Sequence, residues 1–426
     1  MILLEKIFFY LLVFCLPFQT RKIIYQWGGS FNEWASAYLY LTDILLILVF
    51  LLWIWRVRQE RFLILRQVQD IIKGPGFWLG AFLIVSLFSL IEARNLPLGF
   101  YAWFKLLEFA GLFFYLRHNF KDLFDFDNLA RVFVASGIFQ ALIALRQFAQ
   151  QGSLGLSWLT ESPLGLEIDG VAKIVLENLT LLRPYGSLPH PNILAAFLLI
   201  SIFFVYYLWL RREHSFFLNC SLIVVSCLLF FSLLFTFSRV IIIVFILASL
   251  VYLISNFWSA KKKVFGIFLL FLIFSSLFLV FAWPEVSVRF PLSLEDQSIT
   301  LRNFYNQVSF TFISESPWQG VGLGNFVWEM KEAIPLLSDW IHQPVHNIYL
   351  MIISEVGLIG LIVFLMFLYQ LLGQARKENL ILLILFICFL LIGLFDHFFW
   401  TLQQGQLMFW LILGLLSCLE YNKSNL

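Results

Sequence analysis

Arginines that stand at the ends of apolar runs are the first residues of chemical interest, because a guanidinium binds anions. Arg239 follows Ser238 between two apolar runs that have no loop between them. No acidic residue lies within 20 positions of it on either side. A buried guanidinium needs an anionic partner, so a bound ligand is one candidate for that partner. An arginine whose long side chain reaches back to the membrane surface is the alternative.

A second arginine belongs to a proline- and glycine-rich segment. Arg183 is followed by Gly186, Pro191 and Asn192, and an apolar run begins directly after them. Pro191 suits the first turn of a helix, where its missing N–H is not needed. A turn that enters a helix explains the proline and the glycine, but it does not explain the arginine.

Arg302 precedes a stretch rich in glycine. Gly320, Gly322 and Gly324 follow Pro317 within a polar region. A Gly-x-Gly-x-Gly pattern without a preceding strand and a following Rossmann unit is a weak signal for dinucleotide binding. The pattern instead predicts a glycine-rich turn between two short helices.

His346 is the candidate proton acceptor. Asn347 follows it, and nine residues later come Gly357, two further residues and Gly360. An imidazole titrates near neutrality, which suits a general base, whereas a plain helix-start residue is the alternative. Asn347 is expected to orient the histidine or to cap the helix. His342 lies four positions earlier, but no third ligand accompanies the pair, so we predict no metal site.

The elements that position these residues are membrane helices. The chain is 61% hydrophobic and only 13% charged, against roughly 25% charged residues in soluble proteins. A span needs about 20 apolar residues, and twelve runs approach this length. The predicted spans are 4–19, 36–55, 76–93, 99–116, 131–149, 191–210, 216–235, 239–257, 264–283, 347–370, 379–395 and 399–418. The fold class predicted is therefore all-α, a single transmembrane domain over 1–426 with two long polar stretches at 150–190 and 284–346.

The distribution of Lys and Arg predicts the orientation, because cytoplasmic loops hold an excess of them. With both termini inside, the inner segments hold 17 of the 28 basic residues. These are Lys6, Arg56, Arg58, Arg61, Arg66, Lys73, Arg117, Lys121, Arg131, Arg211, Arg212, Lys261, Lys262, Lys263, Arg376, Lys377 and Lys423. Both long polar stretches then fall on the outer side, with the larger between the ninth and tenth spans.

Charged residues near or within the spans give two further predictions. Lys105 and Glu108 lie three apart in one span, where they can pair on one helix face. Asp396 and His397 lie at the outer end of the eleventh run and are expected to line the same cavity as the outer motifs. The five cysteines all lie in apolar runs without a C-x-x-C pair, which argues against disulfides and thiolate metal sites. No basic arm suggests nucleic acid.

Taken in order along the chain, these segments resemble the O-antigen ligase and O-antigen polymerase superfamily of bacterial envelope proteins. The spacing from His346 and Asn347 to Gly357 and Gly360 is similar to the signature of the ligase branch. The Ser238–Arg239 turn, the 183–192 segment and Arg302 ahead of Pro317 also resemble family motifs. The resemblance implies a GT-C-like fold in the bacterial inner membrane, with the active site facing the periplasm.

The same resemblance implies a glycosyltransferase without cofactor or metal. Its donor would be a glycan on undecaprenyl diphosphate, and its acceptor a glycolipid or glycan hydroxyl. Arg239 and Arg302 would bind the diphosphate, His346 would be the base, and Arg183, Asn192, Ser238 and Asn347 would contact substrate. Guanidinium groups suit a diphosphate because they form paired hydrogen bonds to its oxygens.

Three alternatives stay open beside transfer to lipid A core. An O-antigen polymerase would join lipid-linked repeat units, and a protein O-oligosaccharyltransferase would use serine or threonine. A flippase of lipid-linked sugar is the alternative from another class. Flippases and transporters place ionisable residues near the bilayer midplane, whereas the arginines and histidines here lie at the ends of spans.

Overall fold

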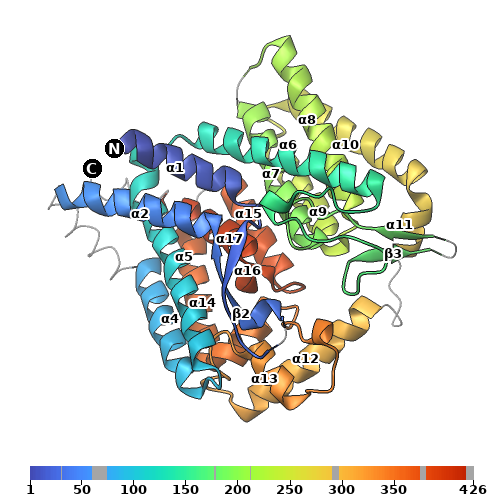
Figure 1. Cartoon of the computed structure of the whole chain (residues 1–426). Coiled ribbons are helices and arrows are strands. Elements are labelled where there is room, and N and C mark those ends of the chain that lie inside the picture. Colours follow the sequence, from blue (N-terminus) through green and yellow to red (C-terminus); the bar gives the residue numbers. More distant parts are fainter. Residues whose placement is uncertain are drawn as a thin grey trace. The chain divides into compact units, whose positions relative to one another are not determined.

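Helices dominate the computed structural model (Figure 1), which describes residues 1–29, 31–59, 74–176, 179–211, 213–289, 297–374 and 380–418. Contacts divide the chain into two compact units. The first comprises Met1–Phe9, Arg21–Leu123 and Ser293–Leu426, and the second comprises Tyr10–Thr20 and Phe124–Leu292. The prediction of a single transmembrane domain remains a prediction. Seven of the basic residues that predict the orientation lie outside the described residues: Arg61, Arg66, Lys73, Arg212, Arg376, Lys377 and Lys423.

Eight helices in the described ranges are long and apolar enough to cross a membrane, and each overlaps a predicted span. They are Pro75–Glu92, Leu96–Leu123, Phe126–Gln150, Pro191–Arg211, Phe216–Phe235, Arg239–Asn256, Lys261–Phe281 and Ile348–Gln374. The multi-pass character predicted from composition is thereby confirmed. The other four predicted spans correspond to shorter or more charged helices, so the total of twelve stays a prediction.

The first unit is built on helices that pack in pairs. Helix α14 (Ile348–Gln374) packs on α4 (Pro75–Ser89), and α17 (Gln403–Ser417) packs on α5 (Leu96–Leu123). The remaining elements are the start of α1 (Ile2–Cys15), η1 (Glu33–Ala35), α2 (Leu41–Gln59), η2 (Leu90–Glu92), α12 (Gln297–Glu315), α13 (Phe326–Ala333), η4 (Asp339–Ile341), α15 (Leu380–Ile392), α16 (Phe398–Thr401) and the strands β1 (Arg21–Gln26) and β2 (Ser36–Tyr40).

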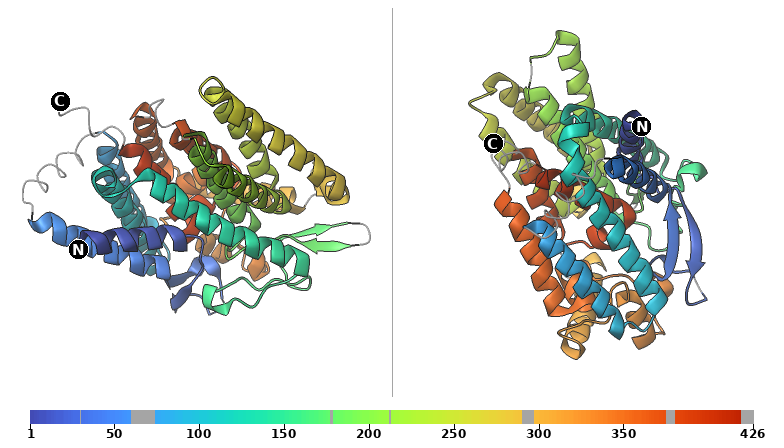
Figure 2. Two further views of the ribbon diagram at one scale, coloured as in Figure 1. Left: turned by 90° about the horizontal axis from the view of Figure 1, so that it is seen from above. Right: turned by 90° about the vertical axis from the view of Figure 1, so that its left-hand side faces the viewer.

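The hairpin of β1 and β2 corrects the predicted span 36–55. Residues Ser36–Tyr40 pair with Arg21–Gln26 as antiparallel strands, and the helix begins only at Leu41. Figure 2 shows the hairpin as the blue pair of strands in its right-hand view. A short apolar run is compatible with a strand and with the end of a helix, so the residues at 36–40 alone do not distinguish the two structures. A break at Leu402 likewise divides the predicted span 399–418 into α16 and α17.

A buried charge network stabilises the first unit beneath the hairpin. Lys105 donates to Asp43 on α2 and to Glu108 on its own helix, both at 2.6 Å. Gln403 of α17 donates to the same Asp43 carboxylate at 2.5 Å. The Lys105–Glu108 pair predicted from its spacing is therefore confirmed. Helix α2 adds a second carboxylate to it, and α17 adds an amide.

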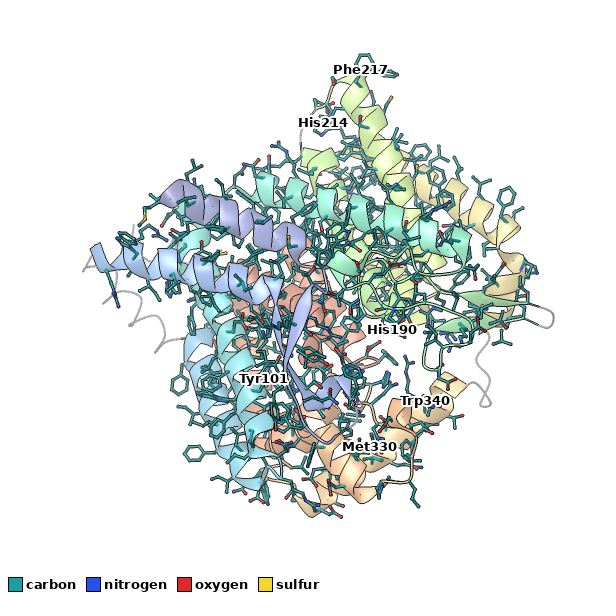
Figure 3. All side chains as sticks on the ribbon, in the orientation of Figure 1. Tyr101, His190, His214, Phe217, Met330 and Trp340 are labelled. Carbon is teal, nitrogen blue, oxygen red and sulfur yellow. The ribbon has the colours of Figure 1, made fainter. Side chains whose placement is uncertain are left out.

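The second unit is a bundle with one short hairpin. Helices α6 (Phe126–Gln150), α7 (Pro191–Arg211), α8 (Phe216–Phe235) and α9 (Arg239–Asn256) are its core, and α7 is buried along most of its length. Helices α10 (Lys261–Phe281) and α11 (Trp283–Arg289), η3 (Ser157–Leu159), β3 (Lys173–Val175) and β4 (Thr180–Leu182) complete it. In Figure 3, His190 marks the residue before α7, and Phe217 marks the first turn of α8.

Candidate active site

His346 stands directly before α14 in the first unit. Asn347 caps this helix, because its side-chain oxygen accepts from the backbone N–H groups of Tyr349 at 2.9 Å and Leu350 at 3.1 Å. The Tyr305 ring of α12 stacks on the imidazole, with centroids 5.5 Å apart and planes at 12°. Tyr305 is held in turn by a 2.8 Å bond from its hydroxyl to the Ile341 carbonyl. The cap thus fixes the backbone next to His346, and the Tyr305 ring packs on its imidazole.

A second imidazole lies against the first. The His397 ring meets His346 edge to face, with centroids 4.8 Å apart and planes at 89°. Nδ1 of His397 lies 2.6 Å from the Thr401 hydroxyl, and its backbone N–H donates to Asp396 at 2.9 Å. Trp34 of η1 packs on the other side of His397, with centroids 6.0 Å apart. The structure thus brings the sequence-predicted Asp396–His397 pair to His346.

The electrostatics keep both imidazoles neutral. Burial lowers the pKa of His346; Asp396 opposes this shift, and the positive charge of Arg302 adds to it. Burial and the neighbouring His346 lower the pKa of His397 to about 3. A neutral imidazole has a lone pair that accepts a proton. His346 Nδ1 is buried and has no hydrogen-bond partner among the described residues, so it is available for that role.

Arg302 supplies positive charge beside this pair. It lies on α12, one turn before Tyr305, and its side chain is half-buried. No hydrogen bond or ion pair joins it to another residue of the part of the chain that the structure describes. Helix α12 is fixed against α14 by a 2.7 Å bond between Ser309 and Ser354. A half-buried guanidinium held on a fixed helix is suited to binding an anionic ligand.

The glycine-rich turn packs backbone to backbone on α14. The N–H groups of Val321 and Gly322 donate to the carbonyls of Ser354 and Glu355 at 2.8 and 3.0 Å. In return, Leu358 donates to the Pro317 carbonyl at 2.9 Å. The exchange is possible because α14 breaks at Gly357, where φ is 76°. The predicted turn between two short helices is confirmed as the connection from α12 to α13.

Two of the motif glycines are required by this close approach. A Cβ at Gly357 would lie 2.0 Å from the Trp318 carbonyl oxygen, and one at Gly320 would lie 2.5 Å from the Glu355 carbonyl carbon. Both residues also have positive φ, which side chains disfavour. At Gly360 a Cβ would meet the Val356 side chain at 2.4 Å. The glycines of the His346 motif therefore allow the helix and the turn to pack closely.

The second unit holds the other predicted residues, and three of them bond to one another. Arg183 donates from Nε to the Thr236 carbonyl at 2.6 Å and from its terminal nitrogen to the Asn192 side chain at 3.0 Å. Ser238 donates to the same Asn192 oxygen at 2.9 Å. This network fixes the tight turn at 236–238, where Phe237 has φ of 47°, and α9 then begins at Arg239.

The two units therefore divide the predicted residues. Arg302, His346, Asn347, Gly357 and Gly360 belong to the first unit. Arg183, Asn192, Ser238 and Arg239 belong to the second. Within the second unit, Arg183, Asn192 and Ser238 bond to one another.

Glu355 is a residue that the sequence analysis missed. It is buried on α14 and accepts from the Trp400 indole at 3.1 Å and from the Phe326 N–H at 3.3 Å. An acidic residue inside an apolar run was the available signal, since ionisable residues within spans are rarely incidental. Trp34 was missed for a different reason: its contact with His397 joins distant parts of the chain.

The described residues contain no group of three or more His, Cys, Asp or Glu side chains placed to hold a metal ion. The histidines of the site instead pack against aromatic rings and each other.

Comparison with known families places part of this site within a matched segment. Residues 223–365 match the family described as O-antigen ligase. This segment of the chain is similar to O-antigen ligase domains. The match covers about a third of the chain, and it includes Arg239, Arg302, His346 and Gly357. It supports the O-antigen ligase superfamily, so the resemblance inferred from the motifs is confirmed.

The O-antigen ligase family consists of glycosyltransferase-like membrane enzymes, and it implies lipid-linked glycans and glycolipid acceptors as substrates. The match to this family therefore indicates glycosyl transfer of the ligase or polymerase type within the membrane. No curated protein matches the chain.

Proposed function

We propose that this O-antigen ligase domain protein transfers a glycan from undecaprenyl diphosphate to an acceptor hydroxyl at the outer face of the bacterial inner membrane. The acceptor proposed is lipid A core. The observation that carries the proposal is the buried Nδ1 of His346, which lacks a partner among the described residues and lies beside the positive charge of Arg302. A proton acceptor next to an anion-binding group is what transfer from a diphosphate requires.

In the proposed reaction His346 takes the proton of the acceptor hydroxyl as that oxygen attacks the anomeric carbon. The bond from the anomeric carbon to the diphosphate oxygen breaks, and the lipid diphosphate leaves with the electron pair. Negative charge grows on this leaving group, and Arg302 and Arg239 stabilise it. This chemistry uses no metal and no nucleotide sugar.

The other predicted substrate contacts take supporting roles in this proposal. Arg183, Asn192 and Ser238 hold the turn from which Arg239 projects, because their polar groups bond to one another. Asn347 holds the first turn of α14 next to His346. These four residues act by positioning an arginine or the base.

An O-antigen polymerase is the second candidate, because the matched family carries ligase and polymerase chemistry alike. It would use the same donor and the same base, and its acceptor would be another lipid-linked repeat unit. A protein O-oligosaccharyltransferase would differ only in presenting a serine or threonine hydroxyl.

A reconstituted transfer assay tests the proposal. Purified protein receives an undecaprenyl-diphosphate-linked glycan with lipid A core, a lipid-linked repeat or a serine-containing peptide as acceptor. We expect transfer to lipid A core that a chelator does not change and that Arg239→Ala, Arg302→Ala and His346→Ala each abolish. Transfer only to the lipid-linked repeat would identify a polymerase. Absence of transfer with every acceptor, from folded protein, would contradict the proposal and favour transport.

A further inference from the structure

A cavity of about 130 Å³ opens in the first unit beside the histidine pair. Residues of η1, β2, α5, α14, α16 and α17 line it, among them Trp34, Tyr38, Tyr101, Trp400 and Gln406. One buried water occupies roughly 10–15 Å³ of cavity volume, so this cavity has room for about ten water-sized groups. A single sugar ring with its hydroxyl groups has about that many non-hydrogen atoms.

The cavity is joined to the proposed base through two contacts. Trp34 lines the cavity and packs on His397, which packs on His346. Thr401 lines it as well, and its hydroxyl lies 2.6 Å from His397 Nδ1. A ligand in the cavity would therefore be separated from His346 by a lining side chain and the His397 ring, all in the same unit.

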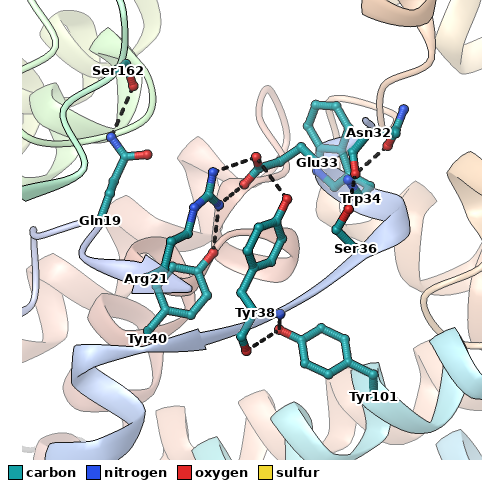
Figure 4. A network of polar contacts seen from close by, with 10 residues as sticks. All are labelled: Gln19, Arg21, Asn32, Glu33, Trp34, Ser36, Tyr38, Tyr40, Tyr101 and Ser162. Atoms are coloured by element: carbon teal, nitrogen blue, oxygen red, sulfur yellow. Dashed lines mark hydrogen bonds and ion pairs between the residues drawn. The ribbon is translucent and has the colours of Figure 1, made fainter. Parts of the chain in front are cut away.

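The walls of the cavity are fixed before any ligand enters. Figure 4 shows Arg21 bonded to Glu33 and Tyr40, with Tyr38 and Tyr101 beside them. The Tyr101 hydroxyl donates to the Tyr38 carbonyl at 3.1 Å and accepts from the Tyr38 N–H at 3.0 Å. These bonds hold the aromatic side chains in place, and a preformed site loses less entropy on binding.

The charges around the cavity argue against a phosphate ligand. The charged residues that line it are two acids, Glu33 and Glu355, and one base, Lys105, which is already paired with Asp43 and Glu108. A phosphate would be repelled, and so would an acidic sugar. A lipid chain is disfavoured as well, because it would cover carboxylates and amides without a hydrogen-bond partner.

A neutral sugar ring suits both the polar and the aromatic side chains that line the cavity. Its hydroxyl groups donate to carboxylate and amide oxygens, and its C–H faces pack on aromatic rings. The indole N–H of Trp34 is buried and has no partner among the described residues, so it is a donor for a sugar oxygen. We propose that this cavity binds a neutral sugar ring of the acceptor, and so sets which acceptor hydroxyl reaches His346. This inference rests on the proposed transfer reaction.

Saturation-transfer NMR on the full-length protein in detergent tests the cavity apart from catalysis. The probes are methyl glycosides of glucose, galactose and N-acetylglucosamine, with inorganic diphosphate and octanoate as rival ligands. The substitution Gln406→Trp fills the cavity. The substitution Gln406→Ala removes an amide but does not reduce the cavity volume. The exposed Gln150→Trp in the second unit is the matched control, and a thermal melt confirms that each variant folds.

We expect saturable binding of at least one glycoside, weakened at least tenfold in Gln406→Trp, about threefold in Gln406→Ala, and unchanged in Gln150→Trp. His346→Ala should bind the glycoside as the wild type does while losing transfer. Glycoside binding without any transfer would remove the proposed reaction but keep the sugar site. No glycoside binding, binding that Gln406→Trp leaves intact, or preferential binding of diphosphate or octanoate would overturn the inference.

Discussion

The imidazoles of His346 and His397 lie edge to face with centroids 4.8 Å apart, in a pocket where neither is expected to carry a charge at neutral pH. Two protonated imidazoles at this distance would repel each other, and burial penalises each charge further. The pair therefore presents one base, His346, whose Nδ1 has no hydrogen-bond partner among the described residues, beside a second ring that stays neutral. This pair and the residues that position the site lead to five predictions.

Transfer should persist below the pH at which an ordinary histidine base fails. A histidine base works only in its neutral form, and an unperturbed imidazole becomes protonated near pH 6.5. Because burial lowers the pKa of His346, the acidic limb of kcat against pH should lie below that value. In Arg302→Gln the pKa of His346, followed by NMR of its imidazole in the absence of substrate, should rise, since Arg302 is one cause of the lowering. A limb above pH 6.5 in the wild type would contradict the proposed environment of His346.

Gly357→Ala should destabilise the protein strongly. The substitution forces a side chain to adopt φ of 76° and places Cβ 2.0 Å from the Trp318 carbonyl oxygen. Strain and overlap together should cost more than about 2 kcal/mol. Thermal melting in one detergent measures the effect. Gly373→Ala on the same helix is the control, because nothing lies within 4 Å of a Cβ there; equal melting temperatures for the two variants would refute the argument.

Arg183→Lys should weaken the turn before Arg239. A lysine cannot bond both the Thr236 carbonyl and the Asn192 side chain in the way that the guanidinium does. Loss of one such bond should cost roughly 1.5–3 kcal/mol, and the rate of transfer should fall with it. The exposed Arg131→Lys, which keeps its charge in the same unit, should change neither quantity. If Arg183→Lys melts at the same temperature as the wild type, the bonds of Arg183 do not stabilise the turn.

Asn347→Ala should lower both stability and transfer, because it removes the cap of α14 beside the base. Loss of a helix cap costs about 0.5–2 kcal/mol. Asn347→Asp keeps an oxygen that accepts from Tyr349 and Leu350, so it should restore the melting temperature. The exposed Asn303→Ala serves as the control. If Asn347→Asp melts normally but transfers no glycan, Asn347 contacts the substrate directly.

Local patterns predicted much of this molecule. Eight predicted spans coincide with membrane-length helices because a continuous apolar run carries its own signal. The glycine-rich turn was predicted from spacing alone. Residues 36–40 were assigned to a helix, because the partner that makes them a strand, Arg21–Gln26, acts through backbone bonds that composition does not record.

The parts of the site that escaped prediction depend on contacts between distant segments. The motif of His346 indicated a base, but the ring of Tyr305 that orients it and the Trp34 ring beside His397 come from other elements. The requirement for Gly357 was suggested by the family spacing, and its cause is the carbonyl of Trp318 on the facing turn. Such pairings are set by tertiary packing, and they become visible only when the elements are assembled.

The most direct test of the account compares the initial rates of glycan transfer by His346→Ala and by His214→Ala, a histidine outside the site, at saturating donor and acceptor. Loss of a general base costs roughly 10²–10⁴-fold in rate. We expect His346→Ala to fall at least a hundredfold while it keeps its melting temperature and donor binding, and His214→Ala to match the wild type. A folded His346→Ala that retains a third or more of the wild-type rate would contradict the role of His346 as the base.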